Sequence, residues 1–343
     1  MRFVKDIFSG KKGGFLLVAL IAGLIALLAA PPAPAAKVHE LKMVSFLPPD
    51  NAYMVGAKSF VDKVNTQMAG KVKIVWRGGP EVIASFDQPK AIASGVVDGA
   101  FTVEGYYTNL VPVAFLKVAR GMTPWEARES GFYDLFNQQH QKPGLHYLGD
   151  FTGFSPFFFY LREKKKIERL SDFKGLIIRT GGIQRPFTEK LGGQPQDIPL
   201  GDVYTALQRG VVDGATAGLT SFGVQWIEQA PYLIEPGYYG ESQPGAILLN
   251  LDRWKSLPPD IQKGLAEITK ENEHVAYEAV KKQHDKAVDD VNAKGAKWIK
   301  FSPEEERQYV QMSRDAIFDF IGKQPGVTKE LLDQFRGVMP GMK

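Results

Sequence analysis

Hydrophobic and polar residues alternate at two places near the start of the chain, with a helical pattern between them. Residues 37–46 and 71–76 alternate as strands with one buried face do, while residues 51–69 carry apolar side chains at helical spacing. This strand–helix–strand order predicts a mainly parallel sheet, because parallel neighbours need a crossover between them. Ligands bind at the carboxyl ends of such strands. The loops that follow the predicted strands here are residues 48–53, 77–80 and 104–107.

The longest helical pattern begins at Pro258 and Pro259 and runs to about residue 293. Proline is accepted in the first turn of a helix, and the apolar residues that follow form one broad stripe. At a rise of 1.5 Å per residue this helix would exceed about 50 Å, so we expect it to brace a two-lobe molecule. Ser302 begins a capping pattern for a helix to about residue 322, and Thr328 begins a short last helix.

One ten-residue segment occurs twice. Residues 91–100 (AIASGVVDGA) return as residues 206–215 (ALQRGVVDGA). Each copy indicates a helix closed by a glycine that can take positive φ, Gly95 or Gly210, and then a short strand through Val-Val-Asp-Gly. The repeat predicts two similar α/β lobes, and the cleft between such lobes is a usual place for a small ligand. Chance recurrence of a common helix–strand junction is the alternative.

The N-terminal segment is typical of an export signal. Basic residues precede an apolar run over residues 15–30, and Ala33 and Ala35 have the spacing of a cleavage site, which predicts a signal peptide over residues 1–35. The run is shorter than the roughly 20 residues of a spanning helix, so a permanent anchor is the less favoured alternative. The chain has no cysteine for a disulfide or a lipid anchor. We expect the protein in the periplasm.

The charge of the chain does not suggest a nucleic-acid partner. Its formal net charge is +4, but residues 1–36 contain four basic side chains and one acidic side chain. Removing them lowers the net charge to about +1, which leaves no basic field to attract a nucleic acid.

Catalytic patterns are absent from the sequence. There is no cysteine nucleophile and no G-x-S-x-G turn, the five histidines are scattered, and glycines at dinucleotide or phosphate-binding spacing are missing. We therefore expect no enzyme, no cofactor and no metal site. Arg179 stands out instead, because it ends an apolar strand over residues 176–180 beside a Gly-Gly turn. Its planar fork suits a carboxylate, although a surface ion pair is the alternative.

Residues 170–214 resemble the DctP-type solute-binding proteins of TRAP (tripartite ATP-independent periplasmic) transporters. The matching motifs are SDFKGLIIR, LGGQP and IPLGDVYTALQRGVVDG, supported by GVVDGA in the first copy and by residues 248–262. The resemblance implies a two-lobe periplasmic-binding-protein fold with a long helix spanning both lobes. Such a protein closes around a small organic acid and delivers it to TRAP membrane permease subunits. The implied division gives lobe I residues 36–155 and about 243–270, and lobe II residues 156–242 and about 271–343.

The resemblance also implies particular ligand contacts. Arg179 corresponds to the principal carboxylate-binding arginine, and Leu200 to a position that touches the ligand. The chain departs from the family at Ala217, where many relatives have an amide, and near Ser155, where a second arginine is frequent. Aromatic residues accompany these departures. Those we assign to the pocket are Phe154 beside Ser155, Tyr106 and Tyr107 beside Glu104, and Phe222 with Trp226.

These residues predict a monocarboxylate ligand with an apolar or aromatic body. Side chains of a strand point to alternate faces, so at most half of the aromatic cluster over residues 151–160 can face one cleft. Glu104 has three alternatives: it binds an ammonium or hydroxyl group of the ligand, pairs with an arginine such as Arg77, or faces away. A periplasmic ligand sensor for a signalling receptor is the alternative function, and a secreted enzyme is a third.

Overall fold

The strand–helix–strand opening predicted from residues 37–76 is present in the computed structural model. The structure describes residues 38–163, 167–198, 202–239 and 244–341, and only the backbone of Ser221 and Phe222. Strand β1 pairs in parallel with β2 and with β3, and helix α2 connects β1 to β2. The predicted signal peptide lies outside the described residues.

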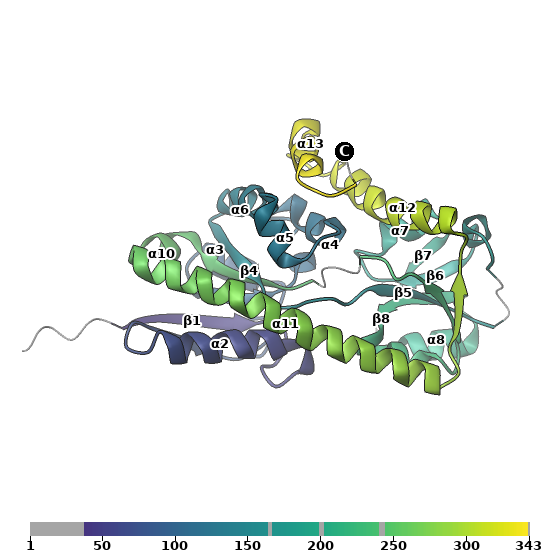
Figure 1. Ribbon diagram of the computed structural model, residues 1–343, viewed down its shortest axis with the longest axis horizontal. Helices are drawn as coiled ribbons and strands as arrows, with labels where there is room; N and C mark the ends of the chain where they lie inside the picture. Colours follow the sequence, from purple (N-terminus) through teal and green to yellow (C-terminus); the bar gives the residue numbers. More distant parts are fainter. Residues whose placement is uncertain (1–37, 164–166, 199–201, 240–243, 342–343) are drawn as a thin grey trace, which may run out of the picture. The chain divides into compact units, whose positions relative to one another are not determined.

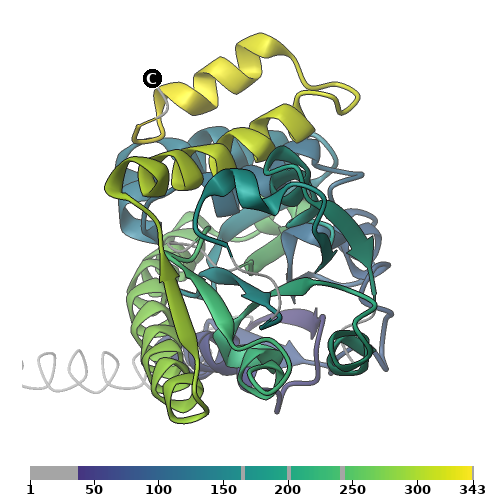
Figure 2. The same cartoon turned by 90° about the vertical axis from the view of Figure 1, so that its right-hand side faces the viewer.

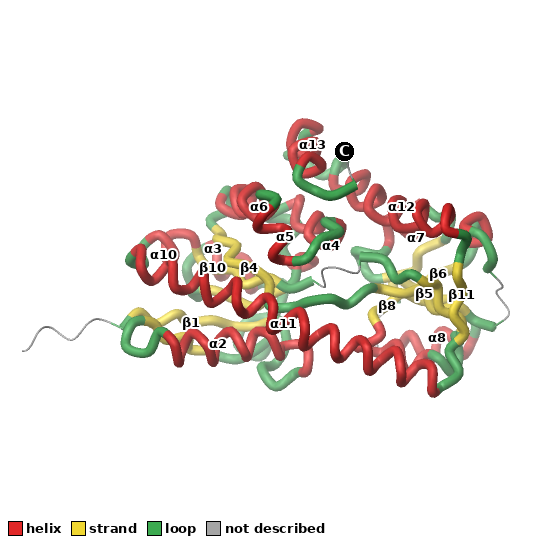
Figure 3. The backbone as a smooth tube through the Cα atoms, viewed as in Figure 1, coloured by secondary structure: helices red, strands yellow, loops and turns green. Residues whose placement is uncertain are grey.

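The strands form two sheets, which Figure 3 shows as separate groups. We call each sheet with its helices a lobe. The lobe I sheet has the order β2-β1-β3-β10-β4, and the lobe II sheet has the order β11-β9-β5-β8-β6-β7. The strands of lobe I are β1 (His39–Ser45), β2 (Val72–Trp76), β3 (Gly99–Thr102), β4 (Leu145–Asp150) and β10 (Ala246–Asn250). Those of lobe II are β5 (Phe157–Leu161), β6 (Ile177–Thr180), β7 (Gln194–Asp197), β8 (Gly214–Gly218), β9 (Tyr232–Glu235) and β11 (Lys297–Lys300). The predicted two-lobe α/β class is confirmed.

Helices follow most of the strands along the chain (Figure 1). In lobe I they are α2 (Val55–Gln67), α3 (Gln88–Ala93), α4 (Leu116–Ala119), α5 (Pro124–Glu129), α6 (Phe132–Gln141) and α10 (Leu251–Lys255). In lobe II they are α7 (Arg185–Lys190), α8 (Val203–Arg209) and α9 (Val224–Trp226). Shorter 3-10 turns are η1 (Ala52–Met54), η2 (Glu104–Tyr106), η3 (Pro112–Phe115) and η4 (Leu170–Phe173), and a π-helical turn is η6 (Leu219–Gly223). Within the described part of the chain, no helix combines the length and the apolar character that crossing a membrane requires.

The predicted brace is helix α11 (Pro259–Ala293), which runs past both sheets in Figure 1. Its length is about 52 Å at the usual helical rise. Near its start, Ile261 and Leu265 are buried in the core of lobe I, while Ala287 and Val291 near its end are buried in the core of lobe II. One apolar stripe thus serves two cores, which is why the helical pattern continues without a break.

Helix α12 (Pro303–Ile321) also contacts both lobes, and α13 (Lys329–Gly337) lies beyond it in Figures 1 and 2. Arg314 of α12 donates from Nε to the carbonyl oxygen of Ala119 in lobe I, over 3.0 Å. Lys190 of α7 in lobe II pairs with Asp319 of α12 at 2.6 Å. The predicted starts at Ser302 and Thr328 are confirmed, since each is the N-cap of its helix.

The repeated segment forms the same junction in both lobes. Asp98 accepts a hydrogen bond from Lys42 N at 2.7 Å and donates its own N–H to Lys42 O. Asp213 does the same with Ile177, accepting from its N at 2.9 Å. This double contact holds the aspartate beside the neighbouring strand, so β3 and β8 begin only at the glycine that follows it. The predicted strand through Val-Val-Asp-Gly was therefore placed too early.

The chain crosses between the lobes at residues 151–156, between β9 and β10, and along α11. The first crossing is extended, so successive side chains point to opposite sides. Ser155 and Phe157 line one cavity, whereas Phe154 and Pro156 line another. The crossing therefore separates two spaces, of about 520 Å³ and about 390 Å³.

Candidate functional site

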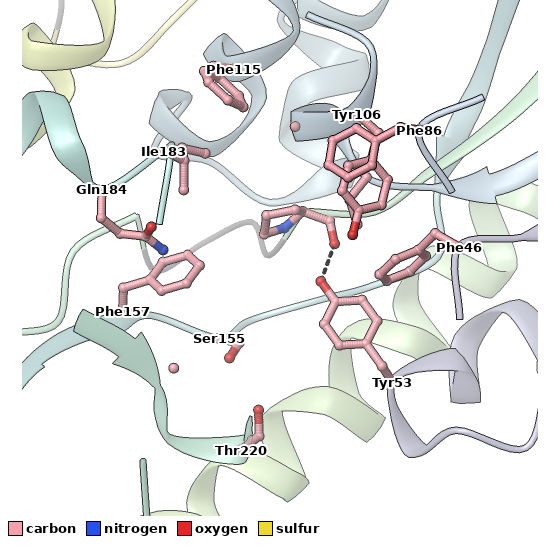
Figure 4. Close-up of a pocket in the computed structure, with 15 residues that line it drawn as sticks. Phe46, Tyr53, Phe86, Tyr106, Phe115, Ser155, Phe157, Ile183, Gln184 and Thr220 are labelled. Atoms are coloured by element: carbon pink, nitrogen blue, oxygen red, sulfur yellow. Dashed lines mark hydrogen bonds between the residues drawn. The ribbon is translucent and has the colours of Figure 1, made fainter. Parts of the chain in front are cut away.

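The larger cavity lies between the two sheets, at the crossings (Figure 4). Lobe I lines it with Phe46, Tyr53, Phe86, Val103, Gly105, Tyr106 and Phe115. Lobe II lines it with Phe157, Gly182, Ile183, Gln184, Gly218 and Thr220, and the crossings add Ser155 and Pro244. None of these described lining residues carries a charge at neutral pH. Its volume of about 520 Å³ suits a small molecule.

Lobe I presents an aromatic wall to this cavity. The ring of Phe46 packs edge-on against Tyr53 at 5.3 Å between centroids, and Phe86 packs against Tyr106 at 4.4 Å. Burial raises the pKa of the Tyr53 and Tyr106 hydroxyls, so both rings stay neutral. Phe86 is 68% exposed, although large apolar side chains are usually covered. The wall therefore offers flat apolar surface, part of it still open to solvent.

Lobe II presents fewer rings and more polar groups. Gln184 lies at the start of α7, and its Oε1 accepts a hydrogen bond from Gly181 N at 3.0 Å. Ser155 is 1% exposed, and its Oγ has no hydrogen-bond partner among the described residues. Gly182 and Gly218 also line the cavity on this side. This wall can form hydrogen bonds that the aromatic wall cannot.

Arg179 lies near the end of β6, in the lobe II sheet. Its Nε donates to the carbonyl oxygen of Ile198 at 2.9 Å, and its Nη1 donates to that of Thr216 at 3.3 Å. Only 8% of the residue is exposed, and no carboxylate among the described residues lies within ion-pairing distance of it. Burial lowers the pKa of Arg179, but an arginine remains charged at neutral pH. Arg179 does not itself line the cavity. Two residues near it do: Gly182, which follows β6, and Gly218, the last residue of β8.

Glu104 is fully buried and faces away from the cavity, into a set of charges behind the aromatic wall. Its Oε1 lies 2.9 Å from Lys117 Nζ, and its Oε2 accepts the N–H of Gly245 at 3.0 Å. Burial raises the pKa of Glu104, and Lys117 limits that rise. Of the three alternatives, the third describes Glu104, which faces away from the cavity; its ion-pair partner is Lys117 and not an arginine such as Arg77.

The same charges continue towards α11. Lys117 also lies 3.2 Å from Asp150, which pairs with Arg120 at 2.9 Å. Burial disfavours the charged form of Asp150, but Lys117 and Arg120 outweigh it and hold its pKa below the usual value. Glu273 of α11 accepts the N–H of Asp150 at 3.0 Å and pairs with Arg128. These residues form what we call the hinge charge network: Glu104, Lys117, Arg120, Arg128, Asp150 and Glu273.

The structure brings Tyr106 and Ser155 to the cavity but leaves other predicted site residues outside it. Trp226 is buried in the lobe II core against Tyr160, at 5.4 Å between ring centroids. Phe154 points to the opposite side of the crossing, where it contacts His284 of α11. Tyr107, next to Tyr106, is also buried, against His140. Leu200 and the side chain of Phe222 lie outside the described residues.

Sequence reasoning missed several lining residues. Tyr53 belongs to one of the loops expected at the carboxyl ends of the strands, so its position was a usable signal. Phe86 and Gln184 had no such signal, because neither residue belongs to a motif and the fold alone brings them together. Among the described residues no cluster of three or more metal-ligating side chains occurs.

Comparisons with known proteins agree with this architecture. The family model of DctP, bacterial extracellular solute-binding protein family 7, matches residues 43–323. The monocarboxylate 2-oxoacid-binding periplasmic protein of Nostoc sp. is 22% identical over 313 residues, covering 86% of this chain and 82% of that protein.

Solved structures show the same fold. A TRAP periplasmic solute-binding protein from Desulfovibrio salexigens, with bound orotic acid, has a TM-score of 0.70 at 17% identity, covering 88% of this chain and 98% of that chain. One from Rhodobacter sphaeroides, in an apo open form, has a TM-score of 0.70 at 22% identity, covering 88% and 96%. This chain therefore shares the two-lobe fold of both structures.

Proposed function

Because the chain belongs to the DctP family of TRAP solute-binding proteins, bacterial extracellular solute-binding protein family 7, we propose that it captures a small organic acid between its lobes. It then delivers this acid to the membrane subunits of a TRAP transporter. Binding is followed by closure of the lobes, with no bond made or broken. The export signal expected over residues 1–35 supports a periplasmic location.

We propose further that the ligand is a monocarboxylate with an apolar or aromatic body. One observation carries this proposal: the buried guanidinium of Arg179 has no carboxylate partner among the described residues, while the cavity beside it is lined by uncharged and largely aromatic residues. A carboxylate near Arg179 would gain charge-assisted hydrogen bonds. The remaining body would lie on the rings of lobe I.

The uncharged cavity also argues against a second carboxylate on the ligand. A second negative charge would be buried beside Phe46 and Tyr106 without a cationic partner, which is costly in an apolar environment. Two of the similar proteins have ligands with a single acid group, since one is named for monocarboxylate 2-oxoacids and another holds orotic acid, whereas a third, matched over 122 residues, is named for C4-dicarboxylates.

A thermal-shift screen tests the ligand class. The probes are benzoate, 3-phenylpropionate, hexanoate and succinate, added to the purified protein. An acid at 100 times its dissociation constant adds about 2.7 kcal/mol to the free energy of unfolding, which is a clear shift in Tm. We expect shifts with the monocarboxylates and none with succinate. A shift with succinate alone would overturn the monocarboxylate proposal, and no shift with any acid would overturn acid binding.

Arg179→Met tests the anchoring residue, with Arg185→Met as the matched control. Arg185 lies on nearby α7 but pairs at the surface with Asp197. Removing the buried charge should weaken the affinity for the acid by about 2–5 kcal/mol in calorimetry, whereas the control should leave the affinity unchanged. Equal affinities in the two variants would remove Arg179 from the site.

A further inference from the structure

The smaller cavity, on the far side of the first crossing, has a cation in its wall. Among the described residues that line it, Arg314 carries a charge at neutral pH and the others do not. We propose that this space, which we call the rear cavity, is a second binding site for a small organic acid with an apolar body, and that an acid bound there opposes closure of the lobes over the larger cavity. The second site goes beyond the proposed function, and only its effect on closure rests on that function.

The walls of the rear cavity come from both lobes and from the segments that join them. Lobe I contributes the end of α4 and Gly121, which follows it, and the first crossing contributes Phe154 and Pro156. Lobe II contributes residues 236–239, which follow β9. Helix α12, which contacts both lobes, contributes Arg314. A molecule in this space would therefore contact both lobes at once.

Arg314 reaches from α12 to lobe I. Its Nε donates to the carbonyl oxygen of Ala119 at 3.0 Å, and its Nη2 donates to that of Arg120 at 3.3 Å. Its Nη1 has no acceptor among the described residues, and no described carboxylate lies within ion-pairing distance of the guanidinium. Asp315, the next residue along the helix, instead accepts from Gln311 at 2.9 Å. A carboxylate in the rear cavity would supply both the opposite charge and the missing acceptor.

The backbone of lobe I accommodates this guanidinium at Gly121. The φ of Gly121 is +63°, and a Cβ built there would be 3.2 Å from the Cζ of Arg314. Any other residue would be strained and would crowd the guanidinium. Burial lowers the pKa of Arg314, which nevertheless stays charged. Arg314 is more exposed than Arg179, so solvent screens it more strongly and the rear cavity should bind an acid more weakly than the larger one.

The rest of the rear cavity suits an apolar body. Phe154, Pro156 and Val310 contribute apolar side chains. The hydroxyl group of Tyr239 already donates to the carbonyl oxygen of Ser313 at 3.0 Å, so it is not left for a ligand. A ligand with several polar groups would bury them there without partners, which is costly. The volume of about 390 Å³ lies in the range of small-molecule sites.

The two cavities are mechanically connected. Tyr238 of the rear wall exchanges two backbone hydrogen bonds, each of 2.9 Å, with Phe157, which lines the larger cavity. Because the first crossing separates the two spaces, a rotation of the lobes about it that narrows one space widens the other. An acid that contacts both walls of the rear cavity holds the lobes at their present spacing. It should therefore weaken binding in the larger cavity, and by linkage an acid there should weaken rear binding by the same factor.

Fluorine NMR with 4-fluorobenzoate tests the second site on the purified protein. Arg179→Met weakens the larger cavity, so this variant should retain one bound molecule, at the rear. Adding Arg314→Met to it should weaken that binding at least about tenfold, because a charge-assisted hydrogen bond is lost. Adding Arg307→Met is the matched control and should leave rear binding unchanged. Arg307 lies on the same helix but pairs with Glu304 at the surface.

Val310→Trp tests the rear cavity without removing the guanidinium, so the test does not depend on the folding of Arg314→Met. Val310 lines the cavity from α12 and is itself exposed, so a larger ring can fill the space without crowding the core. Added to Arg179→Met, it should abolish rear binding. Circular dichroism of each variant checks that it is folded.

Three titrations measure the opposition to closure. Arg179→Met gives the dissociation constant of the rear site, and Arg314→Met gives that of the larger cavity. In the unchanged protein, the product of the two successive dissociation constants should exceed the product of these separate values at least about fivefold. Equal products would overturn the effect on closure.

The other outcomes separate the second site from the proposed function. A single bound molecule that is lost in Arg179→Met would overturn the second site and leave the proposed function intact. A single bound molecule that is lost in Arg314→Met but kept in Arg179→Met would overturn the proposed function and support the second site. Rear binding that survives both Arg314→Met and Val310→Trp would overturn its assignment to this cavity, and no binding at all would overturn both proposals.

Discussion

The two walls of the cavity handle charge in opposite ways. Behind the aromatic wall of lobe I, the acidic and basic groups of the hinge charge network pair with one another at distances of 2.7–3.2 Å. Behind the polar wall of lobe II, Arg179 has backbone carbonyl partners but no acid among the described residues. Each paired charge compensates the burial of its partner, whereas a charge without an opposite partner can select a ligand. The pairing of the charges near a cavity therefore indicates their role better than their number does.

The largest expected effect comes from removing the central cation of the paired side. Lys117→Met leaves Glu104 and Asp150 buried without their shared partner, which should lower the free energy of unfolding by about 3–5 kcal/mol. Urea denaturation measures this loss. Lys63→Met is the control, because Lys63 pairs with Glu271 at the surface, and it should cost much less. Similar losses in both variants would show that the buried pairing does not stabilise lobe I.

The next largest effect is a loss of folding stability at low pH. His140 of lobe I is fully buried, and burial lowers its pKa from 6.5 to about 4. Between these pH values the unfolded chain binds a proton that the folded protein does not, so stability falls as the pH falls from about 6.5 to 4. The loss amounts to about 3 kcal/mol.

Denaturation midpoints measured across this pH range check the acid effect. His140→Gln cannot titrate, so its stability should fall less steeply with acid than that of the unchanged protein. If stability fell equally steeply with acid in His140→Gln and in the unchanged protein, His140 would not be the source of the acid sensitivity.

A smaller effect is expected on ligand affinity, and it should differ between the two sides of the first crossing. Phe86→Ala removes an exposed ring of the aromatic wall, so the unliganded protein should keep its stability, while affinity for an aromatic acid should fall by about 1–2 kcal/mol. Phe154→Ala, on the far side of the crossing, should leave that affinity unchanged. Calorimetry with 3-phenylpropionate compares them, and a larger affinity loss in Phe154→Ala would reverse the assignment of the two cavities.

The smallest expected effect is at the contact between the aromatic wall and the second crossing. Tyr53→Phe removes one hydrogen bond, to the carbonyl oxygen of Pro244, and should lower the free energy of unfolding by about 1 kcal/mol. Urea denaturation measures it. An unchanged midpoint would mean that water replaces the hydroxyl group without loss.

Much of the fold could be predicted because its signals are local. The repeated segment and the stripe of α11 each lie within one stretch of sequence, and the caps at Ser302 and Thr328 depend on residues three positions away. The start of β3 was misplaced because the contact of Asp98 with Lys42 is not local.

The site could be predicted only in part, because its partners are distant in sequence. Glu104 could have paired with many basic residues, and only the fold selects Lys117. Phe154 and Ser155 are neighbours with opposite orientations, and the sequence does not say which of the two faces the cavity. Trp226 looked like a ligand contact because aromatic residues serve cores and pockets equally well.

The first crossing also has a consequence for how this protein can evolve. Because residues 154–157 alternate between the two cavities, the crossing is a partition whose two sides are set by odd and even positions. Point substitutions can change one cavity at a time, for example at Ser155, without touching the other. An insertion or deletion of one residue ahead of Phe154 and Ser155 would exchange the two sides. The ring of Phe154 would then face the larger cavity, and the hydroxyl group of Ser155 would face the smaller one. Relatives with a different ligand should therefore differ in this segment by replacement and keep its length.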